Sequence, residues 1–222
     1  MDAVGVVCEF DPLHRGHEAL LRRAGASGRP VVCAMSGNFT QRGGPACAEK
    51  FVRAEMAARC GADLVAELPT PWAMATAEKF ADGGVDLLSL CGVKTLCFGS
   101  ECGDIDALWT AVEVLLREDI HRAIRAEMDG GLSYAAARQG VLEREAGCGG
   151  LLAQPNNTLA VEYLKAIRRR GLAADAITVR REDGGHHGSA SASRIRALLA
   201  AGQAADAFAL MPPQAADILD RE

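Results

Sequence analysis

Short apolar runs alternate with segments of helical periodicity through the first part of the chain. The apolar runs predict buried strands at residues 3–8, 30–35, 63–68 and 95–98. The segments between them carry apolar side chains at helical spacing and predict helices at residues 17–24, 49–60 and 73–90. Strands and helices that alternate over short connections favour parallel pairing and right-handed crossovers. The pattern therefore predicts an α/β fold built on a doubly wound parallel sheet.

The strand pattern stops after residue 104. Helical patterns follow at residues 105–118, 121–128, 133–145 and 156–170, before one more apolar strand at residues 176–179. A helix beginning near Ser191 and a short terminal helix complete the chain. We expect three parts. An α/β domain comprises residues 1–104 and 171–202, a helical insertion comprises residues 105–170, and a C-terminal helical tail comprises residues 203–222.

Composition narrows the class of protein without naming an activity. The 222 residues carry a net charge of −5, which argues against a general coat for nucleic acid. No apolar run approaches the roughly 20 residues that span a bilayer, and no basic leader precedes the first strand, so we expect a cytoplasmic protein. The eight cysteines show no C-x-x-C spacing, and we expect reduced thiols and no bound metal, zinc in particular.

The most informative segment follows the first strand and reads Glu9-Phe10-Asp11-Pro12-Leu13-His14-Arg15-Gly16-His17. It contains the H-x-G-H pattern at the point where a strand turns into a helix. Gly16 lets a nucleotide lie against the backbone, and the helix start offers free N–H groups to phosphate. Two imidazoles there can hydrogen-bond phosphate oxygens as charge develops on them. The alternative is that His14 and His17 are surface or capping histidines.

A second candidate phosphate site lies near the end of the chain. Ser189-Ala190-Ser191-Ala192-Ser193-Arg194-Ile195-Arg196 opens a helix after a polar loop. Ser191 and Ser193 are good N-caps, and Arg196 lies one turn beyond Ser193 on the same face. Hydroxyls, backbone N–H groups and a guanidinium would converge on one anion there. Taken alone, the segment is better interpreted as a capped surface helix, and its pairing with the H-x-G-H segment favours the phosphate site.

These two sites together resemble the nucleotidyltransferase superfamily, whose α/β fold is Rossmann-like and which carries H-x-G-H and S-S/T-x-x-R motifs. Four further segments narrow the resemblance and occur in one order with the first two. They are residues 36–43 (SGNFTQRG), 61–69 (GADLVAELP), 98–101 (FGSE) and 155–159 (PNNTL). Over essentially its whole length, the chain is similar to the bacterial tRNA(Met) cytidine acetate ligase family.

The resemblance implies a ligase that uses ATP, with Mg²⁺, to activate acetate as acetyl-adenylate. The acetyl group would then pass to N4 of the wobble cytidine of elongator tRNA(Met), as a step of tRNA processing. The catalytic residues implied are His14, His17 and Arg196. The ATP-binding residues implied are Val7, Cys8, Glu9, Phe10, Asp11, Pro12, Leu13, His14, Arg15, Gly16, His17, Glu18, Ala19, Leu20, Gly99, one of Asn156 and Asn157, and Arg180 or Arg181, with Ser191 and Ser193 on the phosphates.

The chain departs from the family pattern in three places. Asp11 and Arg15 stand where family members usually have Asn, and His186-His187-Gly188 stands where Tyr-His-Asp is usual. Asp11 adds a negative charge that Mg²⁺ or Arg15 would have to offset. Family chains also usually continue beyond the equivalent of Glu222 into a region thought to help bind tRNA, so nucleotide chemistry is a firmer expectation than the tRNA acceptor.

Two further segments have competing interpretations. The loop with Ser36, Asn38, Gln41 and Arg42 follows a strand and is placed to cover the acyl or base site, or is simply a rigid turn. Residues 161–199 contain eight Lys and Arg against four Asp and Glu. This excess of positive charge indicates either a solvated helix face with phosphate ligands or an RNA-contacting patch.

Two other functions therefore stay open beside the ligase. One is a small-molecule nucleotidyltransferase, which shares the two phosphate motifs but does not need residues 36–43 or 155–159. The other is a nucleotide-binding module without transfer activity, which Asp11 and Gly188 would suit.

Overall fold

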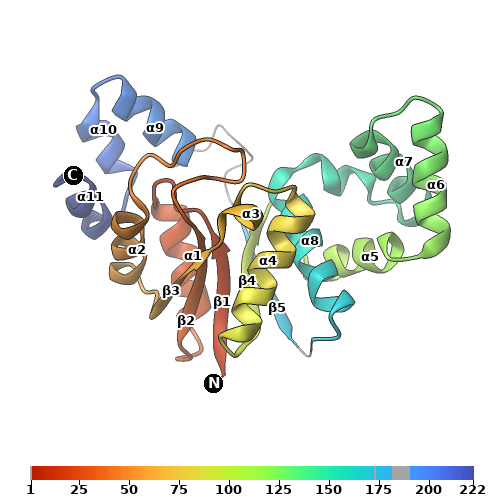
Figure 1. Cartoon of the computed structure of the whole chain (residues 1–222), viewed down its shortest axis with the longest axis horizontal. Coiled ribbons are helices and arrows are strands. Elements are labelled where there is room, and N and C mark those ends of the chain that lie inside the picture. The colour runs from red at the N-terminus through yellow and green to blue at the C-terminus, as the bar shows by residue number, and fades with distance from the viewer. Residues whose placement is uncertain (1, 173, 182–190) are drawn as a thin grey trace.

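A five-stranded parallel sheet forms the centre of the computed structural model, which describes residues 2–172, 174–181 and 191–222. The strands lie in the order β3-β2-β1-β4-β5, and every adjacent pair is parallel (Figure 1). Their bounds are β1 (Ala3–Cys8), β2 (Val31–Ser36), β3 (Leu64–Leu68), β4 (Val93–Ser100) and β5 (Asp175–Arg180). The predicted doubly wound parallel sheet is confirmed.

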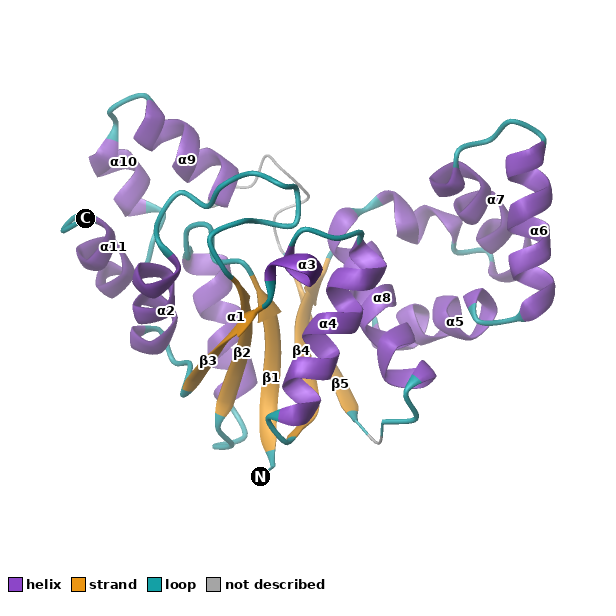
Figure 2. Ribbon diagram, viewed as in Figure 1, coloured by secondary structure: helices purple, strands orange, loops and turns teal. Residues whose placement is uncertain are grey.

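Helices cover both faces of this sheet and extend beyond its two edges (Figure 2). They are α1 (Arg15–Gly25), α2 (Lys50–Arg59), α3 (Thr70–Ala73), α4 (Ala77–Leu90), α5 (Ile105–Leu115), α6 (Glu118–Asp129), α7 (Tyr134–Ala146), the 3₁₀ helix η1 (Gly149–Ala153), α8 (Pro155–Arg169), α9 (Ala192–Ala200), α10 (Ala204–Ala209) and α11 (Pro213–Leu219). The helix expected at residues 73–90 begins later, at Ala77, because the Thr76 hydroxyl caps α4 by accepting from the Lys79 N–H, and α3 is a separate short helix before it. None of the helices in the described ranges has the length and apolar character needed to cross a bilayer.

Strand β1 separates two hydrophobic cores because its side chains alternate between the faces of the sheet. Val4 and Val6 point into a core shared with α1, α2 and the C-terminal helices. Ala3 and Val7 point into a core shared with α4, α5, α7 and α8. Every residue of β1 is buried, as expected for a central parallel strand. The carboxyl end of β1 therefore sits in the middle of the molecule.

The helices after β4 differ in how closely they approach the sheet. Helices α5, α6 and α7 project beyond the β5 edge, whereas α8 packs against α4 and β4 (Figure 1). We propose that α8 belongs with the helical layer of the sheet and that the insertion consists of α5, α6, α7 and η1. The C-terminal helices α9, α10 and α11 lie on the opposite side, beside α2.

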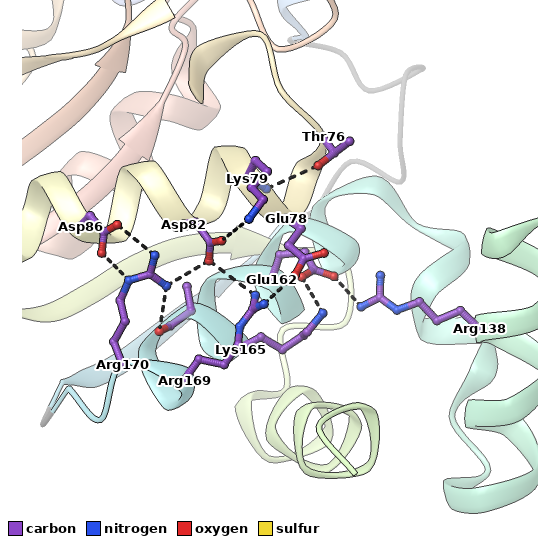
Figure 3. Close-up of polar contacts among 11 residues, drawn as sticks. Thr76, Glu78, Lys79, Asp82, Asp86, Arg138, Glu162, Lys165, Arg169 and Arg170 are labelled. Carbon is purple, nitrogen blue, oxygen red and sulfur yellow. Dashed lines mark hydrogen bonds and ion pairs between the residues drawn. The ribbon is translucent and has the colours of Figure 1, made fainter. Parts of the chain in front are cut away.

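The basic segment at the end of α8 is neutralised by acidic side chains. Arg169 pairs with Glu78 at 2.6 Å, and Arg170 pairs with Asp82 at 3.0 Å and with Asp86 (Figure 3). In the middle of α8, Glu162 forms buried ion pairs with Arg138 and Lys165, at 2.5 and 2.9 Å. Arg168 pairs with Glu113. These contacts tie α8 to α4, α5 and α7, and they favour a structural role for these charges over an RNA-contacting patch.

Arg53 of α2 joins the turns that follow the first two strands. Its side chain is fully buried, and its guanidinium donates to the carbonyls of Glu9 (2.6 Å), Ser36 (3.2 Å), Gly37 and Ala48 (3.0 Å). Burial lowers the pKa of Arg53, and the nearby Asp11 carboxylate opposes this shift. The carbonyl contacts replace the water that the guanidinium loses on folding.

Replacing Arg53 with Met should therefore destabilise the fold strongly. The variant leaves buried carbonyls without donors, and we expect a loss of about 3–5 kcal/mol in the free energy of unfolding. Arg59→Met, on the same helix, removes only an exposed pair with Glu55 and should change stability by less than about 0.5 kcal/mol. Urea unfolding of both variants measures the difference, and equal losses would contradict this account of Arg53.

Candidate active site

A cleft opens at the carboxyl ends of β1 and β4, where the strand order reverses. It consists of two adjoining cavities of about 190 and about 380 Å³. Ligands of open α/β sheets bind at such a reversal, because the loops after the two strands diverge there. The residues that line both cavities are Glu9, His17, Gln41, Asn156, Leu159, Arg181 and Ala192.

His14 and His17 form a capping box at the start of α1. The Nδ1 atom of His14 accepts from the Gly16 N–H at 3.1 Å, and the His14 N–H donates to Nδ1 of His17 at 3.4 Å. The two rings stack with centroids 3.7 Å apart. A side chain at residue 16 would meet the His14 ring, because an added Cβ would lie 2.9 Å from its Cε1 atom. Gly16 therefore lets the His14 ring fold back onto the helix start.

Both imidazoles are neutral at pH 7. Burial lowers the pKa of His14 to about 4, and the positive charge of Arg181 adds to the effect. Burial also holds the pKa of His17 well below its ordinary value, with further contributions from His14 and Arg181. Each Nδ1 accepts a backbone proton, so each ring carries its own proton on Nε2. The pair therefore offers two N–H donors, on residues that line the cleft.

Arg196 reaches from α9 to the turn after β1. Its Nη1 atom donates to the Asp11 carboxylate at 3.1 Å and to the Asp11 carbonyl at 2.5 Å, and its Nη2 atom donates to the Ser193 hydroxyl at 3.3 Å. Ser191 caps α9 by accepting from the Arg194 N–H. The charge of Asp11 is thus offset by Arg196. Arg15, which we expected in that role, is exposed and donates to the Ala209 carbonyl at 3.3 Å.

The structure distinguishes the two residue pairs that the sequence left open. Asn156 and Arg181 line the cleft, and Arg181 Nη1 lies 3.5 Å from Asn156 Oδ1. Asn157 is instead buried and accepts from the Cys102 N–H. Arg180 is exposed and packs beside Gly103. Gly99 lines the cleft and lies under the Arg181 side chain, since an added Cβ would be 3.3 Å from Arg181 Cγ.

Glu101 holds the start of α8 in this position. One carboxylate oxygen accepts from the Asn156 side chain at 2.7 Å and from its N–H at 3.2 Å, and the other accepts from the Asn157 N–H at 2.7 Å. A carboxylate at a helix N-terminus satisfies free N–H groups and the helix dipole together. Glu101 thereby orients Asn156 toward Arg181.

The loop after β2 brings two of its four candidate residues into the cleft. Gln41 and Arg42 line it, and the Gln41 N–H donates to the Glu9 carboxylate at 2.5 Å. Asn38 instead caps α2 by accepting from the Lys50 N–H, and Ser36 is buried at the end of β2. Burial raises the pKa of Glu9, and the Gln41 contact opposes that shift.

The remaining expected residues fall into two groups. Val7, Cys8, Glu9, Phe10, Asp11 and Leu20 line the cleft. The other group is either buried in the core or turned toward solvent, and it comprises Pro12, Leu13, Glu18 and Ala19. Residues His186, His187 and Gly188 lie outside the described part of the chain.

Sequence reasoning missed four large side chains that line the cleft, namely Phe80, Phe98, Leu159 and Tyr163. The Phe98 and Tyr163 rings pack with centroids 5.8 Å apart. Phe98 and Leu159 belong to two of the motifs already quoted, which was a usable signal. Phe80 and Tyr163 look like ordinary core positions of their helices, so nothing in the sequence separates them from the core.

Within the described ranges, no three His, Cys, Asp or Glu side chains are close enough to hold one metal ion together. The expectation that the cysteines bind no zinc stays a prediction.

The parallel sheet, with a histidine-bearing turn after its first strand, is typical of a Rossmann-like nucleotidyltransferase fold. The start of α9, with Ser193 and Arg196, lies near this turn, because Arg196 donates to Asp11. The family follows from comparison of sequences. The chain belongs to the HIGH nucleotidyl transferase family, whose model matches residues 1–222.

Curated relatives are similar along nearly the whole of this chain. A tRNA(Met) cytidine acetate ligase of Syntrophotalea carbinolica is 43% identical, over 99% of this chain and 55% of its own length. One of Acetivibrio thermocellus is 39% identical, over 100% of this chain and 58% of its own length. The chain thus spans somewhat more than half the length of these relatives.

Solved structures show the same arrangement. Thermotoga maritima TmcAL bound with alpha-thio ATP superimposes with a TM-score of 0.91 at 33% identity, covering 100% of this chain and 56% of that one. The apo form of the same protein gives a TM-score of 0.92 at 32% identity. Both matches support the fold over the full length of this chain.

The capping geometry predicts the tautomer of both histidines. At pH 7, ¹⁵N NMR should show His14 and His17 protonated on Nε2 only. Because the pKa of His14 is about 4 in the folded state and about 6.5 when unfolded, unfolding takes up a proton between these values. The free energy of unfolding should therefore fall as the pH drops from 6.5 to 4. A proton on Nδ1 of either ring would contradict the capping box.

Proposed function

We propose that this chain activates acetate with ATP as acetyl-adenylate and passes the acetyl group to N4 of the wobble cytidine of elongator tRNA(Met). The observation that carries the proposal is the cleft, in which two neutral histidines, Arg181 and Asn156 converge at the switch point of the sheet. The likeness to tRNA(Met) cytidine acetate ligases supports the choice of acid and acceptor. A tRNA acceptor implies a cytoplasmic protein.

ATP would lie across both cavities. The apolar wall of Phe98, Leu159 and Tyr163 suits a nucleobase, and the histidine turn suits the phosphates. The start of α9, with Ser191 and Ser193, would face the far end of the triphosphate. We infer that Mg²⁺ enters bound to the phosphate oxygens, because the described residues offer no protein cage for it.

In the first step, an acetate oxygen attacks the α-phosphorus of ATP. A C(O)–O–P bond forms, the bond from the α-phosphorus to the bridging oxygen breaks, and pyrophosphate leaves. Negative charge grows on the phosphate oxygens, which neutral Nε2–H groups and the Arg181 guanidinium stabilise. Neutral donors suit this task because their hydrogen bonds strengthen as that charge grows.

In the second step, the cytidine N4 amine attacks the acetyl carbonyl carbon. The bond from that carbon to the phosphate oxygen breaks, AMP leaves, and the amine loses one proton to the medium. The acceptor base would have to enter the cleft, and Gln41 and Arg42 are among the residues that line it.

An ATP–pyrophosphate exchange assay, run with and without acetate, tests the proposal directly. Exchange that requires acetate supports acetyl-adenylate formation. Exchange that requires a different acceptor would point to a small-molecule nucleotidyltransferase. ATP binding without any exchange would point to a nucleotide-binding module, and either result would overturn the proposed function.

Replacing His14 with Asn should separate capping from chemistry. Asn keeps an acceptor for the Gly16 N–H and is a favourable N-cap, so the free energy of unfolding should change little. Losing the Nε2–H donor should slow acetate-dependent exchange by about 10²–10³-fold while ATP affinity changes much less. His121→Asn on α6 is the matched surface control and should exchange at the wild-type rate. Equal losses in affinity and rate would make His14 a ground-state ligand only.

Arg180 and Arg181 form a natural matched pair for ATP binding. Arg181 lines the cleft and Arg180 does not, although the two are adjacent. Arg181→Leu should weaken ATP binding by about 10–100-fold through loss of a charge-assisted contact, and Arg180→Leu should leave it within about twofold. Isothermal titration calorimetry measures both, and a reversed order would place the nucleotide elsewhere.

A further inference from the structure

Three large apolar side chains in the segments that follow β2 and β3, on the carboxyl side of the sheet where the cleft opens, stay open to solvent. Phe39, Trp72 and Met74 are each 43% exposed, and none of them lines either cavity. Phe39 belongs to the loop after β2, Trp72 lies on α3, and Met74 follows it. Exposed apolar side chains gathered at the edge of a cleft are a mark of interaction sites.

One hydrogen bond joins the two segments that carry these three side chains, which we call the rim. The side-chain amide of Gln41, two residues after Phe39, donates to the carbonyl of Ala75 at 3.1 Å, and Ala75 directly follows Met74. Gln41 also lines the cavity that contains His14 and His17. The rim is therefore continuous with the cleft proposed to hold the activated acyl group.

The two aromatic side chains sit on well-supported backbone. The Trp72 side chain packs against α4 at Gly83, where an added Cβ would lie 2.3 Å from Trp72 Cδ1. Phe39 forms a β-bridge with Pro45, and the Thr40 N–H donates to the Gly44 carbonyl at 2.9 Å. Aromatic surfaces held this way bind a partner with little loss of side-chain entropy.

The charges near this rim suit a polyanion. Arg42 lines the cavity and forms no ion pair with any described side chain. Lys50 and Glu67 neutralise each other in a pair of 2.6 Å. By contrast, Arg168, Arg169 and Arg170 are bound to carboxylates, so they are a poorer candidate for phosphate contact.

We propose that Phe39, Trp72 and Met74 form a stacking platform for the bases of a single-stranded RNA loop, with Arg42 contacting its phosphates. Single-stranded RNA is bound by aromatic side chains that stack on unpaired bases and by nearby arginines. The platform rests on the proposed function, since it is where the acceptor loop would lie while one base enters the cleft.

Tryptophan fluorescence provides a direct test, because the chain has two tryptophans, Trp72 and Trp109. Trp109 lies under the Arg168 guanidinium, 5.0 Å from its ring centroid, away from the rim. The Trp109→Phe variant therefore reports on Trp72 alone. A single-stranded RNA heptamer with a central cytidine should quench this variant saturably at low salt, whereas Trp72→Phe should show no saturable quenching. Equal quenching of the two variants, or no quenching of either, would overturn the proposal.

Affinity variants provide a second test that does not depend on fluorescence. Phe39→Leu and Trp72→Leu keep an apolar side chain but remove the aromatic stacking surface, so each should weaken binding of the labelled heptamer by about 5–100-fold in anisotropy titrations. Phe51→Leu is the matched control, because Phe51 is 70% exposed on α2, away from the two segments that the Gln41–Ala75 hydrogen bond joins, and it should bind like wild type. Urea unfolding of all three variants confirms that they fold. Equal affinities across the three would refute the platform.

The two proposals fail in different ways. Acetate-dependent exchange by wild-type protein, together with a Trp72 signal that RNA leaves unchanged, would overturn the platform and leave the proposed function intact. RNA quenching of Trp72 without any acetate-dependent exchange would overturn the proposed function and leave the platform. Self-association that buries Trp72 in the absence of RNA, seen by sedimentation, would assign the rim to a second copy of the chain.

Discussion

The buried guanidinium of Arg53 is the constraint on which the site depends. It donates to carbonyls in the turn after β1, in the turn after β2 and just before α2, so three segments share one donor group. Every direct partner described for it is a neutral carbonyl, and its positive charge therefore still acts on Glu9 and Asp11. The turn that carries the histidines and the loop that carries Gln41 are held at a set separation because both rest on this side chain.

The histidine turn shows that a capping role and a chemical role do not compete. The two Nδ1 atoms accept backbone protons and set the conformation of the helix start. That same contact places the ring proton on Nε2, and burial keeps the ring neutral. In the H-x-G-H pattern, the Nδ1 atom of each histidine therefore serves the structure, and the Nε2–H group of the same ring is left for the proposed chemistry.

Local patterns predicted most of the fold and the centre of the site. Buried parallel strands are apolar runs, so β1 was predicted to the residue, and the histidine turn is contained within four residues. Contacts between distant segments were not predictable: Arg196 meets Asp11 across 185 positions, and one sequence carries no record of such pairing. Likewise, only the cleft geometry separates Arg181 from Arg180, and only packing shows that Phe80 and Tyr163 face the cleft. The roles of the site residues and the division into domains stay predictions.

The cleft draws its walls from residue 7 at one extreme to residue 196 at the other. A ribosome must therefore release residues 7 to 196 before the complete cleft can form. A nucleotide bound as proposed would contact β1, the start of α8, the end of β5 and α9, and its binding energy would add to the stability of all of them at once. In the cell, the nucleotide concentration would thus affect the lifetime of the folded protein as well as its turnover rate.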